Sequence, residues 1–376
     1  MNKPHSHYIG LMSGTSLDGI DAVLAQIDAN GKSSVLEAVS TGFDDPLRKI
    51  LSDLQSPGQN EIHRENQAAN LLSLAYATCV QQLLQKAELS PAQISAIGAH
   101  GQTIRHQPGF GDLAYTHQTL NPALLAEETG IDVIADFRSR DMAAGGHGAP
   151  LVPAFHDQQF GSNSEDRAAL NLGGIANLTL LPIQGEVRGF DCGPGNMLMD
   201  AWIAEQQGHA YDANGNWALQ GSVHPKLLER MLADSFFAKQ PPKSTGRDDF
   251  HLEWLRNNIG DENIEPEDVQ ATLLHLTAIS ALQALASYAP KTKQLIVCGG
   301  GAQNTALMQL LETKSLELFE HPLIVVTSDQ FGIDPQLVEG LAFAWLAWAH
   351  KEKRPANLPA VTGAKGPRIL GACYPA

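Results

Sequence analysis

The feature that most constrains this chain is the segment 12–21, Met-Ser-Gly-Thr-Ser-Leu-Asp-Gly-Ile-Asp, which interrupts an apolar pattern. An apolar run over residues 8–11 precedes it, and the pattern resumes from Ile20. This predicts a strand, a turn rich in glycine and hydroxyl groups, and a returning strand. The N–H groups and hydroxyls at such a tip bind anionic oxygens, and Asp18 or Asp21 could hold a metal ion beside them. An ordinary glycine-containing hairpin turn is the simpler interpretation of this segment taken alone.

Length and charge limit the function classes. The 376 residues predict about two domains, and a hydrophobic fraction of 43% is sufficient for packed cores. The net charge of −16 disfavours a nucleic-acid or anionic-membrane partner, because both require a basic surface. The four cysteines show no CxxC pairing, so we expect free thiols in a reducing cytosol rather than a zinc site or a disulfide framework.

A cytoplasmic location is expected from the apolar segments. Residues 1–7 are polar and contain no apolar signal region. The stretch 271–289 is interrupted by polar residues, and 337–349 is too short to span a bilayer. Both are interpreted as buried helices.

Mixed periodicities favour an α/β class. Residues 62–89 have helical spacing, whereas 94–99 and 131–135 are short apolar strands that end in polar residues. A glycine-rich stretch at 143–153 is typical of a join between two halves.

The opening pattern then recurs. A strand at 167–172, a glycine turn at 173–177 and a strand at 178–181 repeat the first hairpin, which indicates an internal duplication. A further strand at 294–298 runs into Gly-Gly-Gly at 299–301, with a helix from Thr305 to Leu311 behind it. Two glycine turns in like positions would bind phosphates in an interdomain cleft, and the third would let the backbone approach an adenosine closely.

The ordered set of three turns resembles the actin/sugar-kinase/heat-shock-protein-70 superfamily. Within it, six collinear motifs are similar to the anhydro-N-acetylmuramic acid kinase family, and the resemblance runs nearly end to end. The motifs occupy residues 9–19, 99–103, 135–138, 148–153, 171–177 and 190–196.

The resemblance implies two RNase H-like α/β domains with an interdomain nucleotide cleft, the actin-like ATPase fold. We expect the first domain at 1–130 and the second at 131–335, with a C-terminal helix in 336–376 packing back on the first. The implied enzyme uses ATP and Mg²⁺ to open 1,6-anhydro-N-acetylmuramic acid with water and to phosphorylate it. The product is N-acetylmuramic acid 6-phosphate, an intermediate of peptidoglycan recycling and amino-sugar metabolism.

Asp191 is the predicted catalytic base, which must deprotonate the attacking water. It follows a strand at 187–190 and precedes a Gly-Pro-Gly turn, and by resemblance it matches the family's catalytic aspartate. A helix N-cap or turn aspartate is the alternative that the sequence leaves open. The resemblance and the glycine turns together predict thirteen ATP-binding residues: Gly14, Thr15, Ser16, Leu17, Asp18, Gly19, Ile20, Asp21, Gly173, Gly174, Gly299, Gly300 and Gly301. No protein ligand is assigned to the Mg²⁺, which ATP is expected to hold.

Residues at strand ends are the predicted sugar contacts. They are His100, Gln102, Thr103 and Arg138, together with Glu339 in the helical segment 336–345. Arg138 is the natural bidentate partner for the lactyl carboxylate of the sugar, although an arginine in a surface ion pair has the same appearance. Glu339 is the single acid of its apolar helix, and the sequence leaves open whether it faces the site or solvent.

Three positions depart from the family pattern. Cys192 stands where threonine is expected, His147 where glutamine is usual, and Met12-Ser13 where the superfamily's first loop usually has an aspartate.

Two alternative functions remain open: another small-molecule kinase of the same superfamily, or a nucleotide-gated regulatory or assembly ATPase. The sequence is compatible with a homodimer.

Overall fold

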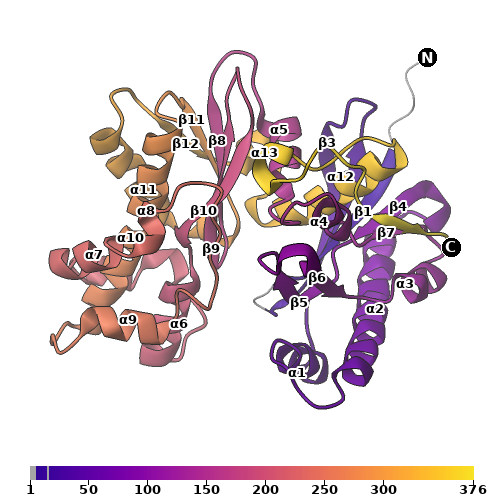
Figure 1. The fold of residues 1–376 in the computed structure, drawn as a ribbon, viewed down its shortest axis with the longest axis horizontal. Helices are drawn as coiled ribbons and strands as arrows, with labels where there is room; N and C mark the ends of the chain where they lie inside the picture. The colour runs from indigo at the N-terminus through magenta and orange to yellow at the C-terminus, as the bar shows by residue number, and fades with distance from the viewer. Residues whose placement is uncertain (1–5, 15–16) are drawn as a thin grey trace. The chain divides into compact units, whose positions relative to one another are not determined.

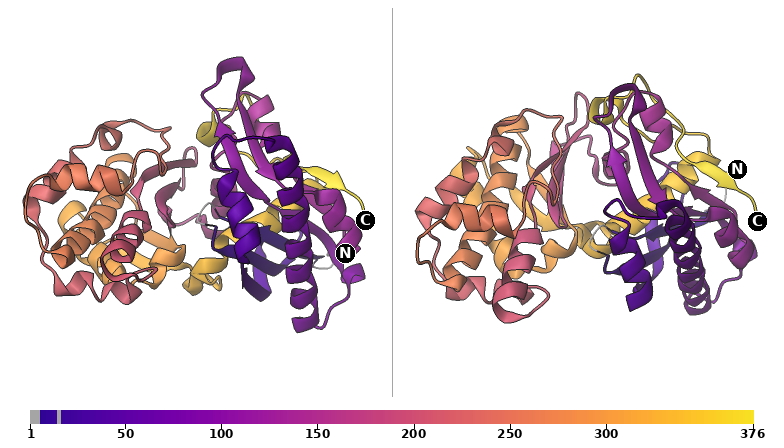
Figure 2. Two further views of the ribbon diagram at one scale, coloured as in Figure 1. Left: turned by 90° about the horizontal axis from the view of Figure 1, so that it is seen from below. Right: turned by 60° about the horizontal axis from the view of Figure 1, so that its bottom comes forward.

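The computed structural model describes residues 6–14 and 17–376, and the chain divides into two compact units (Figure 1). Unit 1 contains Met1–Gln159 and Leu337–Ala376, and unit 2 contains Phe160–Gln336. Each unit has a sheet with helices packed against it, so the predicted α/β class is confirmed (Figure 2).

Unit 1 is built on a six-stranded sheet in the order β13-β7-β4-β1-β2-β3. Strands β1, β2 and β3 pair antiparallel, β4 and β7 continue the sheet in parallel with β1, and β13 pairs antiparallel with β7. The strands are β1 (Ser6–Met12), β2 (Gly19–Ile27), β3 (Ser33–Gly42), β4 (Ile94–Ala99), β7 (Val133–Ala135) and β13 (Ala372–Tyr374). A separate two-stranded ribbon consists of β5 (Gln102–Gln107) and β6 (Tyr115–Thr119).

The helices of unit 1 cover both faces of this sheet. They are α1 (Asp45–Asp53), α2 (Glu61–Lys86), α3 (Pro122–Thr129), α4 (Ser139–Ala143), α5 (Val152–Phe160), α12 (Val338–Lys351) and α13 (Pro359–Thr362). Ile9 and Leu11 share a core with α2, whereas Gly10, between them, faces α12. Because successive residues of a strand point to opposite faces, α2 and α12 lie on opposite sides of the sheet.

Unit 2 repeats the strand order of unit 1. Its five-stranded sheet is ordered β10-β9-β8-β11-β12. Strands β8, β9 and β10 pair antiparallel, β11 is parallel to β8, and β12 is parallel to β11. Numbered along the chain within each sheet, five strands of both sheets have the order 3-2-1-4-5, and unit 1 adds β13 at the edge as a sixth strand. The predicted duplication is therefore confirmed as two RNase H-like units. The strands are β8 (Arg167–Leu172), β9 (Ile175–Leu181), β10 (Arg188–Pro194), β11 (Gln294–Cys298) and β12 (Ile324–Thr327).

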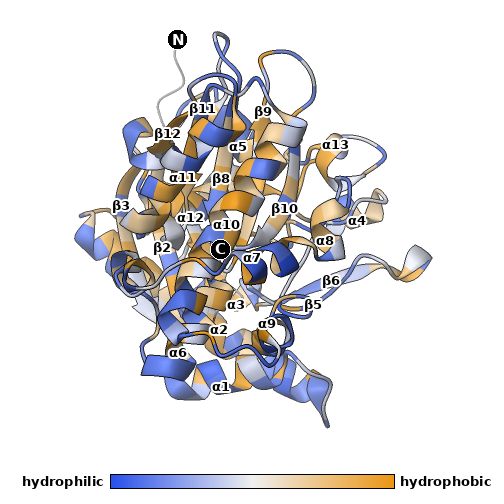
Figure 3. Ribbon diagram, turned by 90° about the vertical axis from the view of Figure 1, so that its left-hand side faces the viewer, coloured by the Kyte–Doolittle hydropathy of each residue, from blue (hydrophilic) through white to orange (hydrophobic). Residues whose placement is uncertain are grey.

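Helix α10 is the core helix of unit 2. Among the described residues it alone is long and apolar enough to cross a membrane, and 72% of its apolar window is buried. Figure 3 colours each residue of the ribbon by hydropathy, and α1 contains both hydrophilic and hydrophobic residues. The helices of this unit are α6 (Met197–Gln207), α7 (Pro225–Leu232), α8 (Ser235–Ala238), α9 (Leu252–Ile259), α10 (Pro266–Tyr288) and α11 (Thr305–Leu318).

Residues 131–159 belong to unit 1 in the structure, whereas the sequence placed them at the start of the second domain. Their strand β7 pairs in parallel with β4, at Val133 opposite Ile97. An apolar pattern locates a strand but does not say which sheet it joins. The C-terminal segment from Leu337 also belongs to unit 1, where α12 packs on β1, β2 and β4.

Candidate functional site

The first glycine loop connects β1 to β2, as the sequence predicted. Ser13 is buried, its Oγ lies 2.9 Å from the hydroxyl of Tyr76, and it donates to the carbonyl of Gly101 at 3.1 Å. The N–H of Leu17 donates to the carbonyl of Gly14 at 3.2 Å, and Leu17 has a positive φ of 60°. Thr15 and Ser16 lie outside the described residues. The described ends of the loop are therefore fixed by the protein's own hydrogen bonds.

The last residues predicted for this loop belong to β2. Ile20 is buried in the core, so only its backbone is available to a ligand. Asp21 accepts a hydrogen bond from Ser40 Oγ at 2.6 Å. Burial is the main cause that raises the pKa of Asp21, and the negative charge of the exposed Asp18 raises it further. The two carboxylates thus repel each other, which a cation would relieve.

Arg48 of α1, which we did not predict as a site residue, binds the C-terminal part of the loop. Its Nε donates to the carbonyl of Leu17 at 3.2 Å, and its Nη2 donates to that of Phe43 at the same distance. Phe43 in turn donates its N–H to the carbonyl of Asp18 at 3.2 Å. The loop is therefore connected to the start of α1.

Two of the predicted sugar contacts, His100 and Arg138, come together beside this loop. Arg138 Nη2 lies 3.0 Å from His100 Nε2, and Arg138 Nε donates to the same nitrogen at 3.3 Å. An arginine only donates, so His100 Nε2 accepts and the ring proton is on Nδ1, which faces the carbonyl of Ser13 at 3.4 Å. Burial, assisted by the charge of Arg138, lowers the pKa of His100 to about 3. His100 is therefore neutral and fixes the guanidinium without neutralising it.

Glu339 lies within electrostatic reach of Arg138. Burial lowers the pKa of Arg138 to about 10, and the carboxylate of Glu339 opposes that shift. Glu339 is half-buried in the first turn of α12. One turn later, the ring of Phe343 lies 4.8 Å from that of His100. Of the two alternatives for Glu339, its half-buried position within electrostatic reach of Arg138 favours the one in which it faces the site.

Gln102 connects the sugar-contact candidates to the glycine loop. It is fully buried, and its Nε2 donates to the carbonyl of Gly14 at 3.1 Å. Its Oε1 is buried and has no hydrogen-bond partner among the described residues. A buried acceptor without a donor is costly, so this atom is suited to receive a donor from a ligand.

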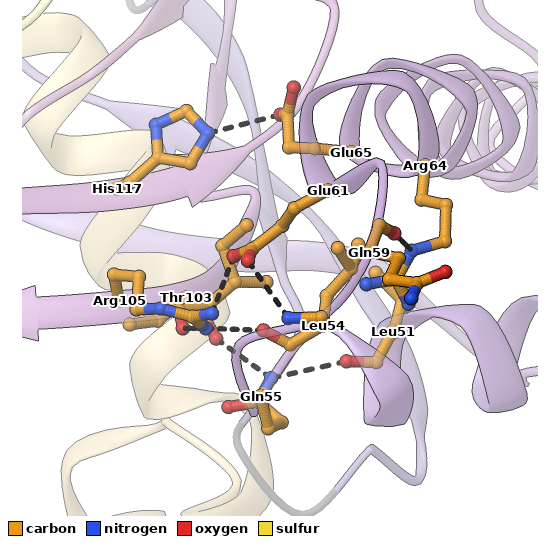
Figure 4. A network of polar contacts seen from close by, with 12 residues as sticks. Leu51, Leu54, Gln55, Gln59, Glu61, Arg64, Glu65, Thr103, Arg105 and His117 are labelled. Carbon is orange, nitrogen blue, oxygen red and sulfur yellow. Dashed lines mark hydrogen bonds and ion pairs between the residues drawn. The ribbon is translucent and has the colours of Figure 1, made fainter.

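Thr103, the next residue, is used by the ribbon itself. Its hydroxyl accepts from Gln118 at 3.1 Å and its carbonyl accepts from Gln55 at 3.1 Å. Figure 4 shows how α2 holds this ribbon at two glutamates one helical turn apart. Glu61 binds Arg105 of β5 at 2.5 Å, and Glu65 binds His117 of β6 at 3.0 Å. Thr103 is thus held by hydrogen bonds at the start of the β5–β6 ribbon, which ion pairs connect to α2. Among the described residues, no hydrogen bond joins Thr103 to His100 or Arg138.

Asp191 lies within β10 of unit 2, at a register irregularity of the strand. Its Oδ2 accepts the N–H of Thr245 at 2.9 Å, and its own N–H donates to the carbonyl of Lys243 at 3.1 Å. Burial raises the pKa of Asp191 to about 6, against the opposing effects of the Thr245 N–H and the charge of Lys243. The N-cap alternative does not hold, because α6 begins at Met197 with Asn196 at its cap.

Lys243 and Thr245 were missed in the sequence. They stand in the segment Pro-Pro-Lys-Ser-Thr-Gly at 241–246, whose glycine and hydroxyls next to a lysine were a local signal for a loop near charged groups. Nothing in that segment indicates that it meets a strand some fifty residues earlier. Only the fold brings it to Asp191.

The predicted glycine turns of unit 2 lie at the carboxyl ends of β8 and β11, which are paired at Asn171 and Cys298. The carbonyl of Gly173 accepts the N–H of Asn196 at 2.8 Å, and that of Gly174 accepts the N–H of Gly195 at 2.9 Å. This edge of a parallel strand pair is where α/β proteins usually build ligand sites.

The turn at 299–301 packs directly on the end of β8. Gly299 has a φ of +82°, and a Cβ there would lie 2.5 Å from Asn171 Oδ1, so only glycine fits. Asn196 Nδ2 donates to the carbonyl of Leu172 at 3.0 Å and secures the same end of the strand. Helix α11 begins at Thr305, as predicted, and a short 3₁₀ segment, Gly300–Gln303, which contains two of the three glycines, precedes it.

The departures from the family pattern have simple structural contexts. Cys192 is buried and its thiol donates to the carbonyl of Ala176 at 3.2 Å, so it faces the core and not a ligand. The side chain of His147 is exposed, and its backbone N–H donates to the carbonyl of Thr362 at 2.8 Å. Across the described parts of the chain, no three His, Cys, Asp or Glu side chains are grouped to hold a metal ion.

A family model and the curated relatives point to one family. A family model described as anhydro-N-acetylmuramic acid kinase matches residues 6–376. A protein of that name from Ralstonia nicotianae is 54% identical over 98% of this chain and 97% of its own length. Another from Burkholderia cenocepacia is 52% identical over 98% and 96%. Among solved structures, an activator of 2-hydroxyisocaproyl-CoA dehydratase from Clostridium difficile covers 92% of this chain and 96% of its own, at 13% identity and a TM-score of 0.46.

Proposed function

The chain belongs to the anhydro-N-acetylmuramic acid kinase family, and from this membership we propose its reaction. The enzyme transfers the γ-phosphoryl group of ATP to 1,6-anhydro-N-acetylmuramic acid while water opens the anhydro bridge. The product is N-acetylmuramic acid 6-phosphate, and the reaction is a step of peptidoglycan recycling and amino-sugar metabolism. We further propose that the enzyme acts in the cytoplasm, without nucleic acid or membrane.

The observation that best supports this reaction is the environment of Asp191. A carboxylate whose pKa is raised to about 6 is ionised at neutral pH yet basic enough to accept a proton. Asp191 takes a proton from the attacking water, whose oxygen bonds to the anomeric carbon. The bond from that carbon to the bridging oxygen breaks, and the bridging oxygen binds the phosphorus as ADP leaves. The phosphoryl group thus replaces the proton that a glycosidase acid would supply, and one carboxylate suffices.

In unit 1, we assign the sugar's lactyl carboxylate to Arg138. Its guanidinium is charged at neutral pH because its pKa, lowered by burial to about 10, still lies well above 7. Its neighbour His100 is neutral, and a planar guanidinium suits bidentate binding of a carboxylate. Glu339 and the orphaned Oε1 of Gln102 are acceptors for sugar hydroxyl or amide donors. We keep Thr103, at the start of the β5–β6 ribbon, as a further contact of the sugar.

For ATP, the proposal keeps the residues predicted from sequence. The loop from Gly14 to Asp21 and the turn Gly173–Gly174 bind phosphates, and the turn from Gly299 to Gly301 lies against the adenosine. Asp18 and Asp21 fit a hard cation, because their carboxylates repel each other and oxygen ligands suit Mg²⁺. When bound, mainly through ATP, Mg²⁺ offsets the charge of the phosphates.

An ADP-release assay tests the reaction. Wild type, Asp191→Asn and the matched control Asp200→Asn of α6 are supplied with Mg·ATP and the anhydro sugar in water enriched in oxygen-18. We expect rapid sugar-dependent ADP release by wild type and the control, one heavy oxygen at the anomeric carbon, and a loss of about 10²–10⁴-fold in kcat for Asp191→Asn.

The same assay separates the alternatives. ADP release without a heavy oxygen in the sugar would mean another small-molecule kinase, and slow ATP hydrolysis indifferent to the sugar would mean a regulatory ATPase. Light scattering on the purified protein measures whether it is the homodimer with which the sequence is compatible.

A further inference from the structure

Asp141 is a buried carboxylate held by neutral donors. It lies in α4, three residues after Arg138, and has an exposed fraction of 0%. Its Oδ1 accepts from Asn357 Nδ2 at 2.6 Å and from Thr362 Oγ1 at 2.7 Å, and its Oδ2 accepts the N–H of Gly148 at 2.8 Å. Burying a carboxylate is costly unless its oxygens are well hydrogen-bonded, as they are here.

Gly148 links this carboxylate to Arg138. Its N–H is held by Asp141, and its carbonyl accepts from Arg138 Nη1 at 2.9 Å. The opposite side of the guanidinium is held by His100 Nε2. Asp141 therefore fixes the position of the Gly148 carbonyl. That carbonyl and His100 Nε2 are the two acceptors that orient the guanidinium of Arg138.

The C-terminal segment fixes Asp141 in turn. Thr362 is 221 residues away in sequence, in the short helix α13. Backbone hydrogen bonds at 2.8 Å join His147 to Thr362 and Lys365 to Ala144, so the loop and the C-terminal segment are held together at several points. The chain of contacts runs from Thr362 through Asp141 and Gly148 to Arg138.

We propose that Asp141, supported by Asn357 and Thr362, is the positioning residue that orients Arg138 toward the carboxylate of the sugar. This rests on the proposed function, which assigns that carboxylate to Arg138. Bidentate binding requires the guanidinium plane to be aligned with the carboxylate, so a small displacement of the Gly148 carbonyl weakens sugar binding. ATP binding does not depend on this contact.

The test uses the full-length enzyme and the matched pair Thr362→Val and Thr362→Ser. Valine keeps the shape and removes the donor to Asp141, whereas serine keeps the donor. We expect Thr362→Val to raise the KM for the sugar about five- to tenfold, and Asp141→Asn to raise it more, because hydrogen bonds to a charged group are lost. The KM for ATP should stay within about twofold, and Thr362→Ser should resemble wild type.

A double-mutant cycle shows whether the effect passes through Arg138. In the Arg138→Met background, Thr362→Val should leave the sugar KM unchanged, since no guanidinium remains to be oriented. Val361→Ala, a buried change one residue earlier, controls for plain destabilisation through its melting temperature.

Two results would overturn the positioning role: an unchanged sugar KM in Thr362→Val, or effects of Thr362→Val and Arg138→Met that simply add. If Asp141→Asn fails to fold, the Thr362 pair still decides. Failure of the proposed function is distinguishable, because wild type would then not turn over the sugar, or Arg138→Met would leave its KM unchanged.

Discussion

At the scale of single residues, one environment supplies both the basicity of Asp191 and a cost in stability. Burial raises its pKa to about 6, while the Thr245 N–H and the charge of Lys243 limit the rise. Lys243 is itself held by the carbonyls of Phe236 and Phe237, at 3.3 and 3.4 Å. The loop that orients the carboxylate therefore also adjusts how readily it ionises.

The first prediction concerns pH. A base must be ionised to accept a proton, so kcat should fall as the pH drops through about 6, the pKa of Asp191. Lys243→Met removes a charge that favours the ionised form and should move this acidic limb to higher pH. Steady-state rates measured across the pH range check both. A limb that stays in place in Lys243→Met would show that Lys243 does not influence the base.

The second prediction concerns stability. Because the folded-state pKa of Asp191 is raised above 3.8, its contribution is favourable below that pH and is lost as the pH rises through about 6. An asparagine in its place would be neutral throughout and could still accept from Thr245. Asp191→Asn should therefore gain melting temperature relative to wild type between acidic and neutral pH, while losing activity. A neutral-pH melting temperature below that of wild type would contradict this account.

At the scale of elements, the packing of α12 on β1 depends on a missing side chain. A Cβ on Gly10 would lie 1.9 Å from the carbonyl oxygen of Gly340, and Gly98 of β4 meets Phe343 in the same way at 2.0 Å. The apolar helix can therefore approach the sheet backbone closely. This contact places Phe343 beside His100.

The third prediction tests this packing. Gly10→Ala should destabilise the protein by about 3 kcal/mol, because two backbones would have to separate to admit the methyl group. Gly109→Ala is the control: a Cβ there meets nothing within 4 Å, so we expect a change within about 0.5 kcal/mol. Urea unfolding of both variants measures the difference. Equal stabilities would mean that α12 does not require glycine at this position.

The elements that could be predicted from the sequence were those with a local signal. Apolar runs and glycine turns located the first hairpin, its repeat at 167–181, and the helix beginning at Thr305. The length of β10 was underestimated: apolar residues end at Phe190, but the strand continues to Pro194 because Asp191, Gly193 and Pro194 still pair with β9. A polar residue in a strand with a functional site does not follow the apolar pattern.

At the scale of the whole molecule, contacts between distant segments were out of reach of the sequence. The pairing of β7 with β4, the N–H of Thr245 on Asp191 and the hydroxyl of Thr362 on Asp141 each join segments without a common motif. Each depends on which sheet a strand joins and where a loop closes, and local periodicity carries no such information. The residue types predicted the chemistry of the site, whereas the hydrogen-bonding partners of the site residues depend on the topology.

The fourth prediction uses the four thiols to report on both units. Cys79 of unit 1 and Cys192 and Cys298 of unit 2 are buried, whereas Cys373 on β13 is exposed. The thiolate is the reactive form, and desolvation raises the pKa of Cys79 and Cys192 and also that of Cys373, so access to the reagent distinguishes Cys373. Native protein at about pH 8 should bind one equivalent of a thiol reagent quickly, and denatured protein four.

The variant Cys373→Ser identifies the reacting group, since it should leave no fast-reacting thiol in the native protein. The slow reaction of the remaining thiols then measures opening of each core, with Cys79 reporting on unit 1 and the other two on unit 2. Rapid labelling of Cys192 would mean that β10 opens readily. The strand that holds Asp191 would then be too mobile to orient a base, and the assignment of Asp191 would fail with it.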